Sequence, residues 1–460
     1  MELSILSILP PLLAIALALS TKNVLLSLFS GTVLGVIILN DFAFVLSLKE
    51  TVFLFFSLVS EPWILKTLGF AVIVGSIMAL IEKSGGIAAF VEYMQNKKQL
   101  ITSPRSALML PFFVGIIIFV ESTITSLIAG AVGKPMCDKY NIPPAKLAFV
   151  CDSTSAPICS LIVLNGWGAL LLGLIATQIS LGTIGGESVA ILIDSVMYNF
   201  YAISALVVTF LFIYFSIDIG AMKNAKAAVI QTSAVPLVEE KKDATMYYML
   251  LPLLLMVTLL FVFLYITGDG NILKGSGSSS IFYTMLCTLV FTLFYFVGTK
   301  NMSLASWGST TLNGAIKLIP IALILLFSFA IGNVINELKT GLYLASLASD
   351  NLSVYFLGSV IFLLAALISF ATGTSWGTFS IMIPVAVPMA VGMDANIALC
   401  IGAVISGGVF GDHCSPISDT TIISSMAAEC DVIEHVQTQL PYALISGAIA
   451  FVLFAVFSFL

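Results

Sequence analysis

Two aspartates and a histidine lie together inside one apolar part of the chain. Within the segment Gly411–Thr421, Asp412 and His413 precede Pro416, and Asp419 follows it. Proline lacks a backbone N–H and clashes with the preceding turn, so a helix entering this segment should break there. A charged aspartate at the centre of a bilayer costs at least about 2.5 kcal/mol and is tolerated where ions or protons pass. The segment predicts a broken helix that binds a cation or a proton, with a kinked helix bonded to its neighbours as the alternative.

Hydroxyl groups surround the same proline. Backbone carbonyls freed by a helix break, together with hydroxyls, supply the oxygen ligands that small hard cations prefer. The candidate ligands here are Ser415, Ser418 and Thr420. His413, whose side chain changes charge near neutral pH, is either a proton carrier or a neutral hydrogen-bonding strut. No second histidine or glutamate stands at zinc spacing, so we expect no metal other than transported Na⁺.

Asp152 has similar surroundings in the first half of the chain. It is followed by three hydroxyl residues, Ser153, Thr154 and Ser155, and then by Pro157. A carboxylate and several hydroxyls before a proline again supply oxygen ligands for a cation such as Na⁺. The alternative is a helix interface in which small polar residues permit close packing.

Two further apolar stretches, 106–133 and 353–391, are interrupted by polar residues. Glu121 lies in the first interruption and either neutralises a cation, carries a proton or caps a helix. The second interruption has no carboxylate, and Trp376 there either stacks on an organic cation or packs at the membrane interface. The remaining candidate ligands of the two interruptions are hydroxyl residues, namely Ser122, Thr123, Thr372, Thr374 and Ser375.

Composition places all these residues in lipid. Of the 460 residues, 59% are hydrophobic and 9% are charged, whereas soluble domains carry about 25% charged residues. Backbone groups in lipid need internal partners, which favours helices. We therefore expect an all-α polytopic membrane protein. Its predicted spans are 3–20, 24–39, 63–81, 147–163, 189–215, 247–267, 281–298, 318–335, 397–427 and 441–459, and the segments 42–60, 166–181 and 301–316 either span the bilayer or lie along its interface.

The stretches 106–133 and 353–391 have the pattern of re-entrant hairpins, in which two short helices meet at a polar tip. Lysine and arginine residues flank the first stretch on both sides, which places both of its ends in the cytoplasm. The same rule makes the polar segment 216–245 a cytoplasmic linker between two halves.

The two halves, 1–215 and 246–460, contain the same features in the same order. In each half a hairpin is followed by a broken helix, 147–163 in the first and 397–427 in the second. The predicted topology gives the halves opposite orientations. This arrangement predicts an inverted repeat of about five spans each, with the transport site near mid-membrane at the broken helices.

Other segments narrow the range of functions. We find no Walker A, dinucleotide-binding or G-x-S-x-G pattern and no basic patch, so we expect neither an ATP-driven pump, nor an enzyme, nor a nucleic-acid-binding protein. Beyond the last motif, a solvated charged turn in a cytoplasmic loop is expected for Glu429, Asp431, Glu434 and His435. The segment Asn165–Trp167 closes the span 147–163 and is expected to anchor it at the membrane interface.

The segment Gly411–Thr421 resembles the most distinctive stretch of the NhaC family of sodium/proton antiporters, within the ion-transporter superfamily, and the tip at 372–378 is similar as well. The resemblance implies a bacterial inner-membrane antiporter with two hairpins in a mobile transport domain, an elevator-type motion and often a homodimer. It marks Asp152, Asp412 and Asp419 as cation and proton sites. By the same resemblance the oxygen ligands are Ser153, Thr154, Ser155, Ser415, Ser418 and Thr420.

Two functions remain open on the sequence. The first is Na⁺/H⁺ antiport without a cofactor, in which the same carboxylates bind either ion. The second is cation-coupled transport of a small organic solute by the same carboxylates. The resemblance suggests it, because members and near relatives of the family carry amino acids, quaternary ammonium compounds, or malate in exchange for lactate. Neither aspartate motif contains an arginine, which favours a cationic or zwitterionic solute. A channel or an intramembrane enzyme is a third class, and no nucleophile–base pair supports the enzyme.

Overall fold

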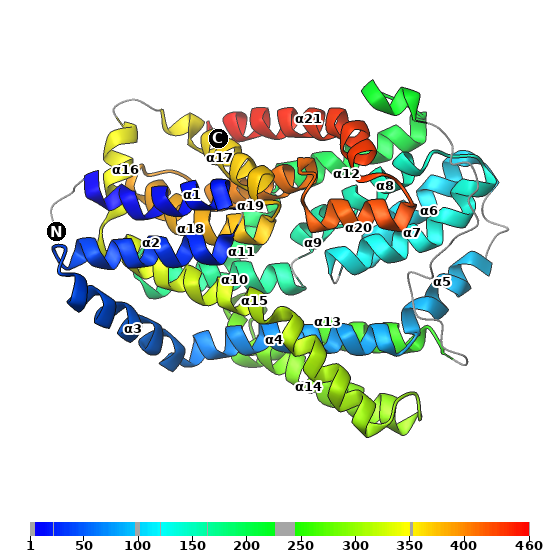
Figure 1. Cartoon of the computed structure of the whole chain (residues 1–460), viewed down its shortest axis with the longest axis horizontal. Helices are drawn as coiled ribbons and strands as arrows, with labels where there is room; N and C mark the ends of the chain where they lie inside the picture. The colour runs from blue at the N-terminus through cyan, green and yellow to red at the C-terminus, as the bar shows by residue number, and fades with distance from the viewer. Residues whose placement is uncertain are drawn as a thin grey trace.

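The computed structural model describes residues 5–21, 23–96, 102–119, 121–162, 164–225, 244–349 and 353–459. Every regular element in these residues is a helix (Figure 1). Ten helical segments of the described chain are long and apolar enough to cross a membrane. The predicted all-α polytopic fold is therefore confirmed. Residues 226–243 of the predicted linker lie outside the described residues.

The helices share an apolar character and differ widely in length. In chain order they are α1 (Leu9–Thr21), α2 (Val24–Leu39), α3 (Phe44–Ser60), α4 (Pro62–Lys83), α5 (Gly86–Asn96), α6 (Pro104–Ile117), α7 (Ser122–Lys139), α8 (Pro144–Ser153), α9 (Ala156–Leu161), α10 (Gly166–Ser180), α11 (Ser188–Met197), α12 (Phe200–Phe215), α13 (Tyr247–Thr267), α14 (Gly277–Gly298), α15 (Leu304–Glu337), α16 (Thr340–Ser349), α17 (Leu357–Thr372), α18 (Ser375–Gly392), α19 (Ile397–Cys414), α20 (Asp419–Ala428) and α21 (Val432–Phe457).

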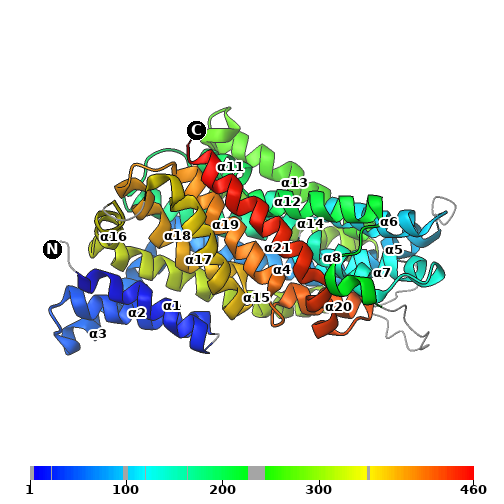
Figure 2. The ribbon, with the colours of Figure 1, turned by 90° about the horizontal axis from the view of Figure 1, so that it is seen from above.

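Both interrupted stretches fold as pairs of helices. In the first pair α6 ends at Ile117 and α7 begins at Ser122, and the second pair, α17 and α18, turns at Gly373. Gly373 has a φ of 67°, a left-handed conformation that glycine adopts without steric cost. The Thr374 hydroxyl then accepts a hydrogen bond from the Gly377 N–H (3.3 Å) and caps α18. Figures 1 and 2 show the two pairs entering from opposite ends of the molecule.

Both predicted broken helices are present. The first is interrupted at residues 154–155, between α8 and α9, and the second at residues 415–418, between α19 and α20. Pro157 lies in the first turn of α9, where a missing N–H removes no helical hydrogen bond, and Pro416 lies within the second break. Since α8 packs against α20 and α9 against α19, the two breaks lie side by side.

The predicted span 189–215 is two helices rather than one. The helix α11 ends at Met197 and α12 begins at Phe200. The Asn199 side chain accepts a hydrogen bond from the Ala202 N–H (3.4 Å) at the start of α12. Asparagine is a favoured first cap of a helix, and the apolar residues on both sides hide this signal in the sequence.

The segments 301–316 and 318–335 belong to one helix, α15, of 34 residues. At 1.5 Å per residue it is about 51 Å long, which exceeds a hydrocarbon core of about 30 Å. The charge of Lys317 separates the two segments in the sequence, but its side chain lines a cavity. The segment 166–181 forms the mostly buried helix α10, and 42–60 forms α3, many of whose apolar side chains are exposed.

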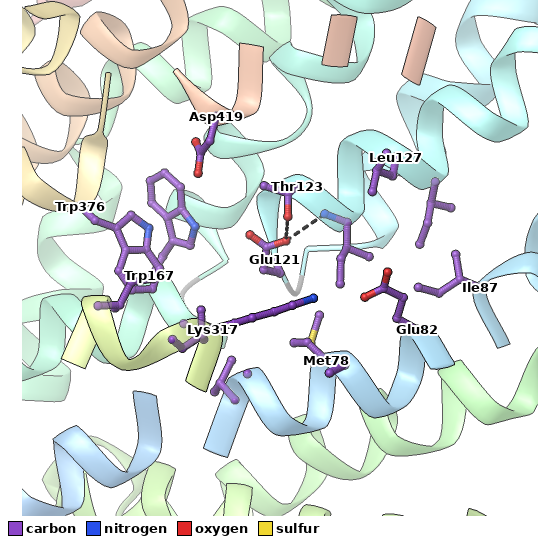
Figure 3. Close-up of a pocket in the computed structure, with 18 residues that line it drawn as sticks. Met78, Glu82, Ile87, Glu121, Thr123, Leu127, Trp167, Lys317, Trp376 and Asp419 are labelled. Atoms are coloured by element: carbon purple, nitrogen blue, oxygen red, sulfur yellow. Dashed lines mark hydrogen bonds between the residues drawn. The ribbon is translucent and has the colours of Figure 1, made fainter. Parts of the chain in front are cut away.

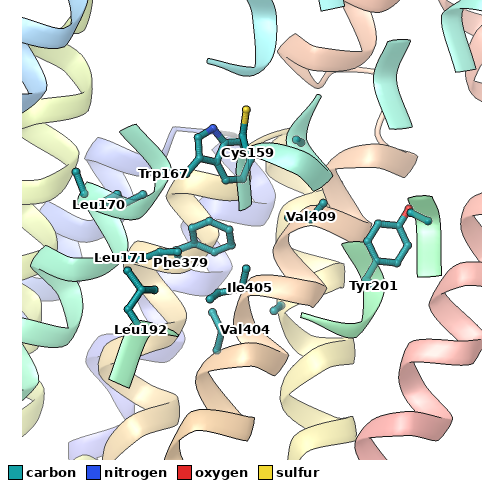
Figure 4. Close-up of a cluster of buried hydrophobic side chains, with 14 of the residues drawn as sticks. Cys159, Trp167, Leu170, Leu171, Leu192, Tyr201, Phe379, Val404, Ile405 and Val409 are labelled. Carbon is teal, nitrogen blue, oxygen red and sulfur yellow. The ribbon is translucent and has the colours of Figure 1, made fainter. Parts of the chain in front are cut away.

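The core lies around α10, α18 and α19 (Figure 4). Trp167 of α10 is only 2% exposed, and its ring centroid lies 5.9 Å from that of Phe379 in α18. The expectation that this tryptophan anchors the membrane interface is wrong, because α10 carries it into the protein interior. Helices α4, α13 and α14 pack together with α15 along the lower side of Figure 1, away from α12 and α21.

Candidate functional site

Asp412, near the end of α19, is buried against the tip of the second hairpin. Its Oδ2 accepts a hydrogen bond from the Oγ of Ser375 (2.9 Å), the first residue of α18. Its Oδ1 has no hydrogen-bond partner among the described residues, although the residue is only 2% exposed. A buried oxygen without a partner carries a desolvation cost. This oxygen is therefore available to a proton or a cation.

Asp419 is the first residue of α20 and lines the cavity described below. Negative charge is favourable at a helix N-terminus. The neighbouring hydroxyls of Ser418 and Thr420 hydrogen-bond to each other (3.0 Å). The two aspartates of the second broken helix thus face different surroundings, Asp412 the second hairpin and Asp419 the cavity.

Asp152, at the end of α8, is fully buried in a polar cluster. Its Oδ2 accepts hydrogen bonds from Gln439 Nε2 (2.7 Å) and Thr421 Oγ1 (3.3 Å). The same oxygen lies 3.3 Å from His435 Nε2 and 3.7 Å from His413 Nε2. Its Oδ1 has no hydrogen-bond partner in the described part of the chain. The cluster joins the first broken helix to the second and to α21.

His413 contacts a hydroxyl at each ring nitrogen. Its Nδ1 lies 2.6 Å from the Tyr201 hydroxyl, and its Nε2 lies 3.4 Å from the Ser153 hydroxyl. If the Tyr201 hydroxyl donates to Nδ1, then Nε2 carries the proton that faces Asp152. The His413 carbonyl also accepts from Gln439 Nε2 (2.6 Å). His413 is thus a hydrogen-bonded strut, and its role as a proton carrier stays a prediction.

The assignment of His435 to a solvated turn is wrong. Asp431 caps α21, and this helix begins well before the predicted span 441–459. His435 and Gln439 are four residues apart and therefore lie on one face of α21. This spacing of polar side chains was the signal that could have identified them. Tyr201 lies within the apolar helix α12 and gave no such signal.

Glu121 both caps α7 and lines the cavity. Its Oε2 accepts hydrogen bonds from the Ile124 N–H (2.9 Å) and the Thr123 hydroxyl, and the Ser122 hydroxyl donates to Oε1 (3.4 Å). The helix-cap role is therefore present in the structure. The carboxylate nevertheless remains part of the cavity lining.

Asn165 attaches the first hairpin to the first broken helix. Its Nδ2 donates to the carbonyls of Phe119 (2.7 Å) and Ile162 (2.9 Å). Its Oδ1 accepts from the N–H groups of Trp167 (2.9 Å) and Gly168 (3.2 Å) and so caps α10. The tip of the first hairpin is thereby fixed to the junction of α9 and α10.

Several candidate oxygen ligands use their hydroxyls locally. Three of these hydroxyls donate to backbone carbonyls near them in the chain: Thr154 donates to the carbonyl of Val150 (2.9 Å), Ser155 to that of Asp152 (2.8 Å) and Thr372 to that of Ile368 (2.8 Å). The Ser415 hydroxyl accepts from the Ile417 N–H (3.4 Å). These bonds stabilise the helix ends next to the breaks and the second tip. A hydroxyl that donates one hydrogen bond still keeps lone pairs for a cation.

A cavity of about 340 Å³ lies between the two hairpin tips and the helices α4 and α15. Its charged lining residues are Glu82, Glu121, Lys317 and Asp419 (Figure 3). Trp376 of the second tip also lines it, with its ring centroid 6.1 Å from that of Trp167. Trp376 therefore packs on another tryptophan and also borders the cavity. Glu82 and Lys317 were missed because a single charge beside an apolar run is typical of the end of a span.

The fold and these charges define the class of protein. Carboxylates, histidines and a lysine belong to a bundle of apolar helices, and the buried members gather at two broken helices. Such placement inside a membrane protein is typical of an ion or solute pathway. The protein is a multi-pass secondary transporter.

The chain belongs to the Na⁺/H⁺ antiporter family, whose model matches residues 164–459. It is 34% identical to an uncharacterised protein of Haemophilus influenzae over 96% of this chain and 88% of that protein. It is 38% identical to the malate-2H⁺/Na⁺-lactate antiporter of Bacillus subtilis over 23% of this chain and 24% of that protein. Its fold is similar to that of Neisseria gonorrhoeae MtrF, with a TM-score of 0.57, 15% identity and coverage of 91% of this chain and 85% of that chain. MtrF is described as illuminating a class of antimetabolite efflux pumps.

Proposed function

We propose that the protein is an antiporter of the bacterial cytoplasmic membrane that exchanges Na⁺ for H⁺, and that the two ions compete for Asp412. The buried Oδ1 of Asp412, which has no hydrogen-bond partner among the described residues, carries this proposal. A buried carboxylate has to be paired or neutralised, and either Na⁺ or H⁺ meets that need. Because one oxygen does not hold both ions at once, their competition couples the two fluxes.

Asp152 is the second proposed site for a cation or a proton. Its Oδ1 is also without a partner in the described residues, and His413 and His435 approach its Oδ2. His413 follows Asp412 directly in the last turn of α19. An ion that moves Asp412 therefore also acts on the histidine that faces Asp152.

The proposed motion uses the division of the chain into repeats 1–215 and 246–460, joined by the cytoplasmic linker 216–245. The two hairpins and the two broken helices form the proposed transport domain. Helices α4, α13, α14 and α15 pack together and form the proposed scaffold of an elevator-type transporter that acts as a homodimer. The entry of the hairpins from opposite ends supports this division.

A second candidate function is coupled transport of a small organic solute. The cavity favours it, because about 340 Å³ falls within the roughly 300–1,000 Å³ typical of small-molecule sites. A bare Na⁺ is held by a few oxygen ligands, whereas the two indole rings beside the cavity offer a large apolar surface that an organic solute can cover. The similarity to an antiporter named for malate and lactate also supports an organic cargo.

The test is a proton-flux assay in proteoliposomes that contain the purified protein and a pH-sensitive dye. Addition of Na⁺ should drive proton movement in the wild type, and Asp412→Asn should reduce it at least about tenfold because an amide does not exchange a proton for Na⁺. Asp394→Asn is the matched control, since Asp394 is exposed between α18 and α19. No Na⁺-dependent proton movement in the wild type, or equal movement in Asp412→Asn, contradicts the proposal.

A further inference from the structure

Two cavities meet at charged residues on α4 and α15. The cavity of about 340 Å³ and a second hollow of about 670 Å³ share the lining residues Ala79, Glu82 and Lys317. Glu82 and Lys317 therefore lie where the hollow leads into the cavity. Figure 3 shows the Lys317 side chain extended across the cavity, with its ammonium directed towards the space between Glu82 and Glu121.

The hollow has the character of an aqueous vestibule. Its lining on α15 includes Ser306, Thr310, Asn313 and Lys317. These residues are three or four positions apart and so share one face of the helix. Polar residues in membrane helices face the bundle interior or a water-filled cavity. The second hollow thus places a polar face of α15 next to the inner cavity.

The backbone around Lys317 is fixed by a close helix crossing. A Cβ atom at Gly75 would lie 2.3 Å from the Gly314 carbonyl oxygen, and one at Gly314 would lie 2.3 Å from the Gly75 oxygen. Only glycine fits at such a crossing. Near the ends of the two helices, Asn301 Nδ2 donates to the Ser84 carbonyl (3.0 Å). The helix pair therefore fixes the backbone beside the cavity from which the exposed Lys317 side chain extends.

The charges of the cavity favour a solute that carries both signs of charge: the net negative lining attracts a cationic group, and Lys317 adds an ammonium for a carboxylate. Its lining carries three carboxylates and one ammonium, and Lys317 forms no ion pair within the described residues. The same ammonium attracts a solute that carries a carboxylate, while the carboxylates attract a positive group on that solute.

We propose that the cavity binds a small amino-acid-like zwitterion, with its carboxylate on Lys317 and its cationic group between Glu121 and Asp419. Its apolar part packs against Trp376 and the aliphatic wall. This inference rests on the second candidate function and names its substrate class. Lys317 belongs to α15, whereas Glu121 and Asp419 belong to the first hairpin and the second broken helix. The zwitterion therefore bridges the proposed scaffold and the proposed transport domain.

Ligand binding to the purified full-length protein tests the proposal. A thermal-shift screen of the common L-amino acids and ornithine selects the probe, and calorimetry compares it with the amine that lacks its carboxylate and the acid that lacks its amine. For leucine these are 3-methylbutylamine and 4-methylpentanoate. We expect the amino acid to bind at least about tenfold more tightly than either, which is about 1.4 kcal/mol.

Variants locate the carboxylate contact. Lys317→Ala should lower the affinity for the amino acid to that for the amine, and Lys317→Arg should retain the preference for the amino acid. Lys49→Ala removes an exposed lysine of α3 and should change neither the affinity for the amino acid nor the affinity for the amine. The comparison of ligands on the wild type needs no variant, so it decides the matter even if Lys317→Ala fails to fold.

The outcomes separate this inference from Na⁺/H⁺ exchange. The zwitterion proposal is overturned by any of three results. These are that no amino acid stabilises the protein, that the amine binds as tightly as the amino acid, or that Lys317→Ala binds the amino acid as tightly as the wild type. If the wild type moves protons with Na⁺ but binds no amino acid, the exchange proposal stands and this inference fails. If it binds amino acids through Lys317 but moves no protons with Na⁺, the zwitterion stands and Na⁺/H⁺ exchange fails.

Discussion

Replacement of Gln439 by leucine removes the donor that joins the two broken helices. The Nε2 of this fully buried residue donates to Asp152 Oδ2 (2.7 Å) and to the His413 carbonyl (2.6 Å). A hydrogen bond to a charged group contributes about 1.5–3 kcal/mol, and one between neutral groups about 0.5–1.5 kcal/mol. Leucine has a similar size but no donor. We therefore expect Gln439→Leu to lower the free energy of unfolding by roughly 2–4 kcal/mol.

Equilibrium unfolding of the purified protein in mixed detergent micelles, followed by circular dichroism, measures this difference. The matched control is Gln178→Leu, because Gln178 of α10 is 1% exposed and its side chain makes no hydrogen bond to the Asp152 cluster. Both variants replace a buried amide by an apolar group, so their difference reports the bonds of Gln439 alone. If Gln439→Leu is as stable as Gln178→Leu, these bonds do not hold the broken helices together and the reasoning is refuted.

Two further substitutions test how the first hairpin is held. Asn165→Ala should lower the free energy of unfolding by about 1–3 kcal/mol. It removes the cap of α10 and the hydrogen bond to the Phe119 carbonyl. Thermal unfolding measures the loss, and an unchanged unfolding midpoint contradicts the prediction. Gly115→Ala places a Cβ atom 2.1 Å from the Thr154 hydroxyl oxygen and should cost about 1–3 kcal/mol by overpacking, with a loss of transport in the flux assay. Gly308→Ala, which meets no atom within 4 Å, is its control, and equal transport by the two variants would refute the steric argument.

The breaks in the helices were predictable because their causes are local. Pro157 and Pro416 remove backbone donors at positions that any reader of the sequence can find. The tip at Gly373 is equally local, since its left-handed conformation depends on one glycine. The fold class, the division of both interrupted stretches into pairs of helices and the breaks in the two other helices follow from such signals and from composition; re-entry of the two pairs into the membrane stays a prediction, since α17 and α18 are each part of a segment long enough to cross it.

The partners of Asp152 were not predictable because they come from distant parts of the chain. His435 and Gln439 reach it only through the packing of α21 against α8. Tyr201 joins the same network through His413, which lies 212 positions away. Lys317 was hidden for another reason: a charge next to an apolar run has the same appearance at a span boundary and beside an internal cavity. Only the packing of α4 against α15 distinguishes the two cases.

The tip of the second hairpin connects the proposed ion site with the proposed solute site. Ser375 bonds to Asp412, and the next residue, Trp376, lines the cavity and packs against Trp167. Consecutive helical residues project about 100° apart on one rigid turn, so a shift of the tip that changes one contact also changes the other. A ligand moves a conformational equilibrium only as far as its contacts differ between the states. One contact of each proposed ligand site therefore belongs to the same turn of α18, Ser375 for the ion and Trp376 for the solute, which gives ion and solute a direct route for coupling.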